Sequence, residues 1–123
     1  LGVYGLLTIF NHAKSGKLNV LGVTTPKRSS AAPDIPTLAE SGFPGFDASI
    51  WAGELAPAAT PKDIVDKLSV EIGRIVRLPE IASRIASQGA EPVGNTPALF
   101  SAFIAAESAK YARIIKQSNI KLN

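Results

Sequence analysis

Two threonines at the end of an apolar stretch have the side chains best placed for binding chemistry. Thr24 and Thr25 directly follow residues 18–23, a nearly continuous apolar run that predicts a strand covered on both faces. In open α/β sheets, ligands bind beyond the carboxyl ends of the strands. We therefore predict that Thr24 and Thr25 contact a ligand. The alternative is that threonine stands there only because it suits strands.

Two further features invite a binding interpretation, and each has a plainer one. Lys27 and Arg28, followed by Ser29-Ser30, could hold an anion, although a basic pair in a solvated loop is the simpler interpretation. Trp51 is the only tryptophan, and it could line a cleft and contact a ligand. For a lone tryptophan the default is packing in a core or hinge, so both interpretations stay open.

The residues that catalysis would need are scarce. There is no Cys, which excludes disulfides, thiol catalysis and cysteine-based metal sites. His12 is the only histidine, and nothing near it suggests a serine nucleophile with a supporting acid. The glycines form neither a GxGxxG nor a P-loop pattern. We predict no enzyme, no cofactor and no metal site; a catalytic pair of carboxylates is the remaining enzymatic alternative.

Composition supports a folded domain and argues against nucleic-acid binding. Of the 123 residues, 46% are hydrophobic and 19% charged, as in ordinary globular proteins. The net charge of +3 comes from scattered Lys and Arg, whereas nucleic-acid binders concentrate charge on one face or arm. No apolar run approaches the ~20 residues of a membrane span. The sequence starts at Leu1 and contains no Met, so we expect it to be processed or part of a longer chain.

The first part of the chain predicts an α/β arrangement with too few strands to form a complete sheet. Its expected elements are a short helix over 8–15 ended by Gly16, a strand over 18–23, a short helix from Thr37 to Gly42, and a strand over 46–56. Thr37 and Glu40 have the spacing of a capping box. Two strands are too few for a parallel sheet of normal size, so we expect partner strands to be missing.

The second part predicts helices. Start signals occur at Thr60-Pro61, Pro79 and Thr96-Pro97, and apolar residues recur at helical spacing behind them. Gly89 is expected to cap the middle helix, and the last helix is expected to end near Ser118. Apolar faces left uncovered would drive association. An alternative function is therefore an oligomerising interaction module, present as a dimer or strand-exchanged oligomer.

Motifs spread over nearly the whole chain resemble the Bug family, the substrate-binding proteins of tripartite tricarboxylate transporters. They are His12-Ala13-Lys14-Ser15-Gly16-Lys17-Leu18, Leu21-Gly22-Val23-Thr24-Thr25-Pro26-Lys27-Arg28-Ser29, Pro33-Asp34-Ile35-Pro36-Thr37, Trp51-Ala52-Gly53, Leu55-Ala56-Pro57 and Gly89-Ala90-Glu91-Pro92-Val93-Gly94. Each motif is weak alone, but their order and spacing make the resemblance specific.

The resemblance implies an α/β fold, the C-terminal portion of a type II periplasmic-binding-protein-like receptor with few strands and several helices. Residues 1–57 would belong to the second lobe and include a hinge strand, and residues 58–123 would pack on the first lobe. The implied function is periplasmic capture of small carboxylates or related small molecules for the transporter's membrane subunits. The implied site includes the Tyr4-Gly5 loop, where the chain departs from the polar residue and proline common in relatives, and Trp51 beside the cleft.

Overall fold

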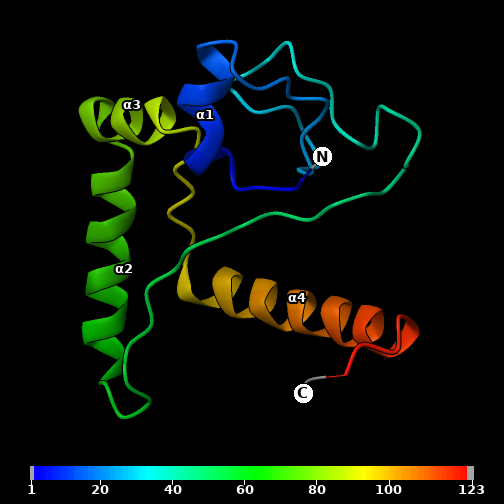
Figure 1. The fold of residues 1–123 in the computed structure, drawn as a ribbon. Coiled ribbons are helices and arrows are strands. Elements are labelled where there is room, and N and C mark those ends of the chain that lie inside the picture. Colours follow the sequence, from blue (N-terminus) through cyan, green and yellow to red (C-terminus); the bar gives the residue numbers. More distant parts are fainter. Residues whose placement is uncertain (1, 122–123) are drawn as a thin grey trace. The chain divides into compact units, whose positions relative to one another are not determined.

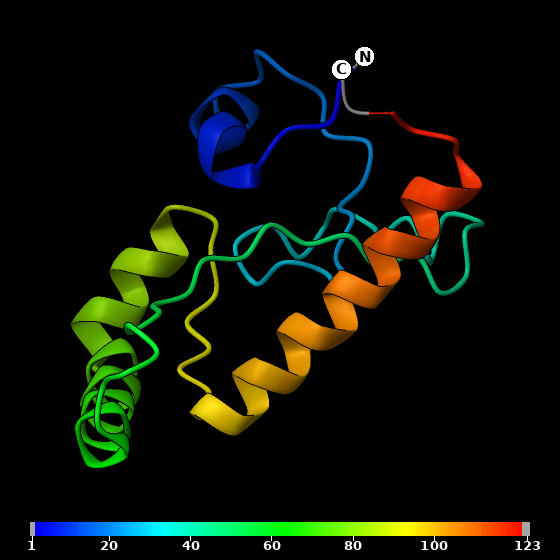
Figure 2. The same ribbon diagram turned by 90° about the horizontal axis from the view of Figure 1, so that it is seen from below.

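Helices joined by long irregular segments make up the structure, a computed structural model that describes residues 2–121 (Figure 1). The helices are α1 (Leu6–Lys14), α2 (Lys62–Val76), α3 (Pro79–Ser87) and α4 (Pro97–Gln117). Within residues 2–121 no strand is formed. Figure 2 shows that the chain between α1 and α2 runs as an open trace without a ribbon arrow.

The chain divides into two compact units. The first contains Leu1–Leu55 and Ile75–Val93, and the second contains Ala56–Arg74 and Gly94–Asn123. Helices α1 and α3 lie in the first unit and α4 lies in the second. Most of α2 belongs to the second unit, and its last two residues belong to the first.

In the first unit, α1 begins and ends on local backbone signals. The carbonyl of Gly5 accepts hydrogen bonds from both the amide and the hydroxyl of Thr8, at 3.0 and 2.7 Å. At the other end, Gly16 donates to Ala13 and Lys17 donates to His12, both at 3.0 Å, which is a Schellman motif. This motif needs a left-handed residue, and Gly16 has a φ of 71°. The predicted stop at Gly16 is confirmed, and the helix starts two residues earlier than predicted.

The strand predicted over 18–23 is wrong. Only Val23 is paired: it donates to the carbonyl of Pro36 and accepts from the amide of Leu38, both at 2.9 Å, forming an isolated parallel bridge to Thr37. Leu21 is exposed. A ladder extends only where a neighbouring strand presents matching backbone groups along its length, and Thr37 starts a turn instead of a strand.

The strand predicted over 46–56 is also wrong. The amide of Ala48 donates to the carbonyl of Thr24 at 2.9 Å, but residues 46–56 carry no strand assignment. Ile50 and Leu55, which should face a covering layer, are exposed. The alternating pattern identified an extended segment, but no partner ladder runs beside it in the part of the chain that the structure describes.

The capping box at Thr37 is confirmed, although the helix behind it is a single turn. The Thr37 hydroxyl accepts from the Glu40 amide at 3.0 Å, and the Glu40 carboxylate accepts from the Thr37 amide at 2.8 Å. Ser41 donates to the Thr37 carbonyl at 3.1 Å, and Gly42 then adopts a φ of 104°. We call residues 37–42 the capped turn. Thr37 is 2% exposed, the most buried side chain described.

The remaining helix boundaries match their sequence signals. Helix α3 begins at Pro79, and after it Gly89 donates to Ala86 while Ala90 donates to Ile85, so the predicted cap is confirmed. In the second unit, the Thr96 hydroxyl accepts from the Leu99 amide at 3.3 Å and α4 ends at Gln117. Helix α2 starts at Lys62, directly after the predicted Thr60-Pro61 signal.

Burial is sparse among the described side chains. Val23 is the buried hydrophobic one, and Ser29 and Thr37 are the buried polar ones. Large apolar side chains along two helices are exposed: Ile64, Leu68, Ile72 and Ile75 on α2, and Leu99, Phe103, Tyr111, Ile114 and Ile115 on α4. The periodic apolar stripes that predict helices are therefore present, but many of their side chains are exposed.

Candidate ligand-binding site

The turn at Thr24 and Thr25 directly follows Val23, whose backbone bonds to Pro36 and Leu38 hold its start in place. Both threonines are half-buried. The Thr25 hydroxyl donates to the carbonyl of Lys27 at 2.7 Å, so its proton is used within the turn. A hydroxyl oxygen still has lone pairs that accept hydrogen bonds. The Thr24 carbonyl is used by Ala48, which fixes the backbone of the turn against residues 46–56.

Gly5 lies against the same extended segment. A Cβ atom added to Gly5 would lie 3.2 Å from Cδ1 of Ile50, so the backbone before α1 and the Ile50 side chain are in close contact. Tyr4 is 69% exposed. Its ring covers Gly2, because a Cβ added at Gly2 would clash with it.

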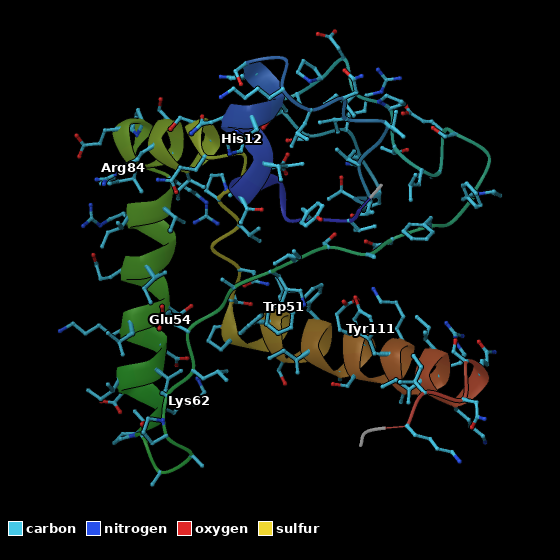
Figure 3. All side chains as sticks on the ribbon, in the orientation of Figure 1. His12, Trp51, Glu54, Lys62, Arg84 and Tyr111 are labelled. Carbon is cyan, nitrogen blue, oxygen red and sulfur yellow. The ribbon has the colours of Figure 1, made fainter. Side chains whose placement is uncertain are left out.

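Residues 48–51 therefore connect several of the predicted site residues. Ala48 bonds to Thr24, Ile50 meets Gly5, and Trp51 follows directly. Trp51 is 43% exposed and is labelled in Figure 3. Thr25 is adjacent to Thr24 in sequence. The structure thus gathers the turn and Gly5 along one short stretch of chain, whereas the Tyr4 ring is turned toward Gly2.

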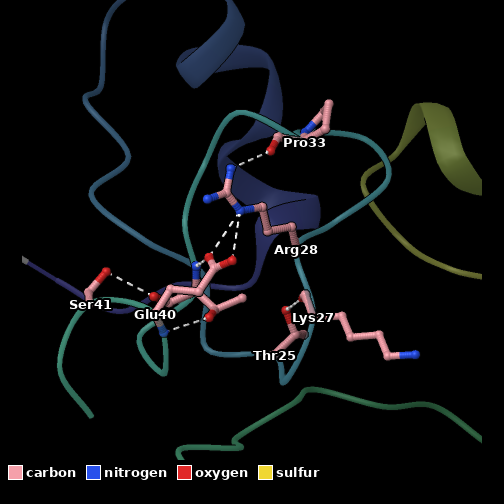
Figure 4. Close-up of polar contacts among 7 residues, drawn as sticks. Thr25, Lys27, Arg28, Pro33, Glu40 and Ser41 are labelled. Atoms are coloured by element: carbon pink, nitrogen blue, oxygen red, sulfur yellow. Dashed lines mark hydrogen bonds and ion pairs between the residues drawn. The ribbon is translucent and has the colours of Figure 1, made fainter. Parts of the chain in front are cut away.

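The two residues of the basic pair, Lys27 and Arg28, differ in their contacts. Arg28 Nε donates to both carboxylate oxygens of Glu40, at 3.1 and 2.9 Å, and Arg28 Nη1 donates to the Pro33 carbonyl at 3.1 Å (Figure 4). Arg28 is therefore used within the protein, which favours the solvated-loop interpretation of this residue over direct anion binding. The neighbouring Lys27 side chain points away from this network in Figure 4.

Sequence reasoning missed the Arg28–Glu40 pair. The two residues lie 12 positions apart, with Pro33 and Pro36 between them. The hydrogen bond from the Thr37 amide, followed by that from the Arg28 side chain, lowers the pKa of Glu40 below its ordinary value. Both favour the ionised carboxylate. The capping box gave a signal for Glu40, but no local spacing pointed to Arg28.

Two open hollows lie elsewhere. One of about 370 Å³, in the first unit, is lined by residues that include Lys14, Asn19 and Asp34. The other, of about 480 Å³ in the second unit, is lined by residues that include Lys62, Asp66 and Thr96. Neither hollow is lined by a predicted site residue.

The described residues show neither a metal-binding cluster nor a membrane-spanning helix. Residues 2–121 contain no group of three or more His, Asp or Glu side chains that could hold a metal ion. The single histidine, His12, is an exposed residue of α1 (Figure 3). No helix within these residues has the length and apolar character needed to cross a membrane.

Comparison with known proteins identifies relatives along almost the whole chain. Residues 3–120 match the family described as tripartite tricarboxylate transporter family receptor. The chain is similar to protein BugT of Bordetella pertussis, with 34% identity over 114 residues. That match covers 93% of this chain and 35% of BugT, so the chain spans about a third of the length of this relative.

Solved structures of related proteins have the same local fold. The R. palustris protein Rpa4515 with adipate matches with a TM-score of 0.81 and 30% identity, covering 94% of this chain and 38% of that one. The periplasmic binding protein BugD matches with a TM-score of 0.78 and 33% identity, covering 92% of this chain and 38% of BugD. The chain is therefore similar in fold to part of a periplasmic binding protein.

Proposed function

The chain belongs to the tripartite tricarboxylate transporter receptor family, and we propose that it is the C-terminal portion of a periplasmic receptor that captures small carboxylates for such a transporter. The observation that carries this proposal is the family match over residues 3–120, together with a relative of known structure that holds adipate. The membrane subunits of the transporter would be its protein partners.

The two parts of the chain would belong to different lobes of the receptor. Residues 1–57 belong to the second lobe, and the segment around Trp51 crosses toward the first lobe as the hinge. Residues 58–123 pack their apolar faces on the first lobe. The exposed side chains on α2 and α4, such as Leu68 and Ile115, support this assignment because apolar surface of this extent favours a covering partner. The chain's coverage of only about a third of BugT supports it as well.

Ligand capture would proceed by cleft closure without covalent chemistry. The carboxylate would accept hydrogen bonds from backbone amides and side chains at the Thr24-Thr25 turn and the Tyr4-Gly5 loop, with Trp51 beside the cleft. Closure follows when the ligand makes contacts in the closed state that it lacks in the open one. A receptor of this kind needs no catalytic residue and no cofactor.

Calorimetry on the full-length receptor tests the proposal. Adipate, citrate and other di- and tricarboxylates are titrated alongside monocarboxylates, a neutral sugar and a short oligonucleotide. Binding of at least one carboxylate, with no heat from the sugar or the oligonucleotide, is the expected result. Tight binding of the sugar or the oligonucleotide alone would refute the proposal.

An oligomerising interaction module is the second candidate, favoured by the exposed apolar faces of α2 and α4. In that case the 123-residue chain would dimerise or exchange segments without binding a ligand. Light scattering distinguishes the two functions by the mass of the particle. An assembly module gives one defined oligomer at all concentrations above its dissociation constant. A receptor fragment gives no oligomer of defined size.

A further inference from the structure

We propose that Arg28 and Glu40 form a clamp that positions the Thr24-Thr25 turn for ligand binding. This inference rests on the proposed function, since it assigns a role to residues that support the same site. The clamp consists of the two Arg28 Nε bonds to the Glu40 carboxylate and the Arg28 Nη1 bond to the Pro33 carbonyl.

The turn belongs to a loop that is closed at its base. Val23 is bonded to Pro36 and Leu38, so residues 24–35 leave and return at the same point. Several bonds within the loop are local ones, such as Ala32 to Ser29 and Ile35 to Ala32, each between residues three apart. Bonds of this kind shape the individual turns. Two further bonds join the loop to other segments: Ala48 donates to the Thr24 carbonyl at 2.9 Å, and the Ser30 amide donates to the Glu91 carboxylate at 3.4 Å.

Arg28 is the side chain that ties the loop to the capped turn, because its guanidinium reaches in two directions. One bond stays inside the loop, at Pro33, and the others leave the loop for Glu40 in the capped turn (Figure 4). A planar guanidinium holds such an arrangement in a defined orientation, which a lysine ammonium would not. The middle of the loop is thus tied to the capped turn.

Glu40 is a rigid anchor. Its carboxylate also accepts from the Thr37 amide at 2.8 Å, and the buried Thr37 hydroxyl accepts from the Glu40 amide. The carboxylate is therefore oriented by the backbone amide of Thr37, the residue whose side chain is the most buried described. From this anchor the connection runs through Arg28 to its neighbour Lys27, whose carbonyl accepts from the Thr25 hydroxyl.

The clamp is exposed enough that positioning, and not global stability, is its main effect. The side chains of Arg28 and Glu40 are 45% and 48% exposed. Exposed ion pairs contribute little to stability because solvent screens them. A small change in the position of a binding group still alters affinity, because the ligand must then pay for ordering the loop.

Two substitutions in the full-length receptor test the clamp, alone and combined. Arg28→Met removes the guanidinium. Glu40→Gln removes the negative charge but keeps the capping box, since glutamine is accepted at that position. Glu71→Gln is the matched control, because the Arg74–Glu71 pair has the same 2.9 Å separation and similar exposure but lies on α2.

Adipate affinity by calorimetry is the first readout. We expect each single substitution to raise Kd about threefold to tenfold, as for the loss of one hydrogen-bonded group. The double variant should lose no more than the worse single one, because both remove the same clamp. Glu71→Gln should bind as the unsubstituted receptor does. Additive losses would instead make Arg28 a direct ligand contact, and unchanged affinity in both single variants would overturn the clamp.

Amide hydrogen exchange is the second readout and needs no ligand. Faster exchange at residues 27–32 in both variants, with unchanged exchange in α3, supports a positioning role. Unchanged exchange at these residues overturns it. If the unsubstituted receptor binds none of the carboxylates, the proposed function fails and the affinity claim fails with it. Binding by the unsubstituted receptor and the single variants alike would refute the clamp alone.

Discussion

The Thr24 carbonyl accepts a 2.9 Å hydrogen bond from the Ala48 amide. This bond joins the end of the first predicted strand to the segment that precedes Trp51, although neither stretch forms a strand. The candidate binding turn is therefore attached to the segment proposed as the hinge. A ligand bound at the turn would act on that segment through this backbone hydrogen bond.

Trp51 offers an optical test of this connection. We expect adipate to shift the tryptophan emission of the full-length receptor, because Trp51 is the only tryptophan of this chain and its environment would change on closure. Each tryptophan outside these 123 residues is replaced by phenylalanine beforehand. Trp51→Phe should then abolish the shift while leaving calorimetric binding detectable. A ligand that binds by calorimetry without altering the emission would remove Trp51 from the cleft.

Gly5 should tolerate little added volume. Gly5→Ala places a methyl group 3.2 Å from Cδ1 of Ile50, so the Ile50 side chain must move by a few tenths of an ångström. We expect a loss of about 1 kcal/mol in the unfolding free energy of the full-length receptor, within the range for overpacking. Ile50→Val shortens the opposing side chain and should restore part of this loss. The measurement is denaturant unfolding of both single variants and the double variant; strictly additive losses would show that the two residues do not meet.

Thr37 should be sensitive because its side chain is buried and its hydroxyl accepts the hydrogen bond from the Glu40 amide. Thr37→Val removes the acceptor for the Glu40 amide while keeping the shape of the side chain. We expect a loss of about 1–3 kcal/mol in unfolding free energy, the range for a buried group left without its partner. Thr37→Ser keeps the capping hydroxyl and is the control. Equal losses in the two variants would show that the methyl group, and not the cap, matters.

The Glu40 carboxylate makes stability depend on pH in one direction. Its pKa is lowered in the folded protein, so folding favours the ionised form. The contribution is complete above the pKa of the unfolded chain, near ~4.3 for an unperturbed glutamate, and is lost as pH falls through the lower folded pKa. Glu40→Gln should flatten this acid part of the stability profile. An unchanged acid limb in thermal melts of the variant would contradict the prediction.

The apolar faces of α2 and α4 should make the 123-residue chain self-associate. Leu68 and Ile115 are exposed on these helices. We expect Leu68→Asp and Ile115→Asp to lower the apparent mass in light scattering and the binding of a hydrophobic dye. Lys67→Asp, next to Leu68 but outside the apolar stripe, is the control. If the unsubstituted chain is a monomer that binds no dye, the exposed faces do not drive association.

Local signals explain which parts of the fold the sequence predicted. Pro79, Thr96-Pro97, Gly16 and Gly89 act within one helical turn, so the helix ends that they mark were predicted to within about two residues. The capping box at Thr37 and Glu40 was found for the same reason.

Non-local pairing explains the errors. A strand at 18–23 or 46–56 would need a second backbone alongside it, which an apolar pattern cannot guarantee. The Arg28–Glu40 pair joins residues 12 positions apart, so no local spacing predicted it. The approach of Ile50 to Gly5 was also beyond local reasoning. Thr24 and Thr25 were identified as site candidates by their position after an apolar run, and their contact with a ligand remains a prediction.

The near isolation of Val23 as a buried hydrophobic side chain among those described has a calorimetric consequence. The heat capacity change of unfolding grows with the apolar surface that unfolding newly exposes to water. Where little apolar surface is hidden, that change and the denaturant slope are both small for a chain of this length. The 123-residue chain alone should therefore melt over a broad range of temperature, while its helical circular dichroism fades gradually.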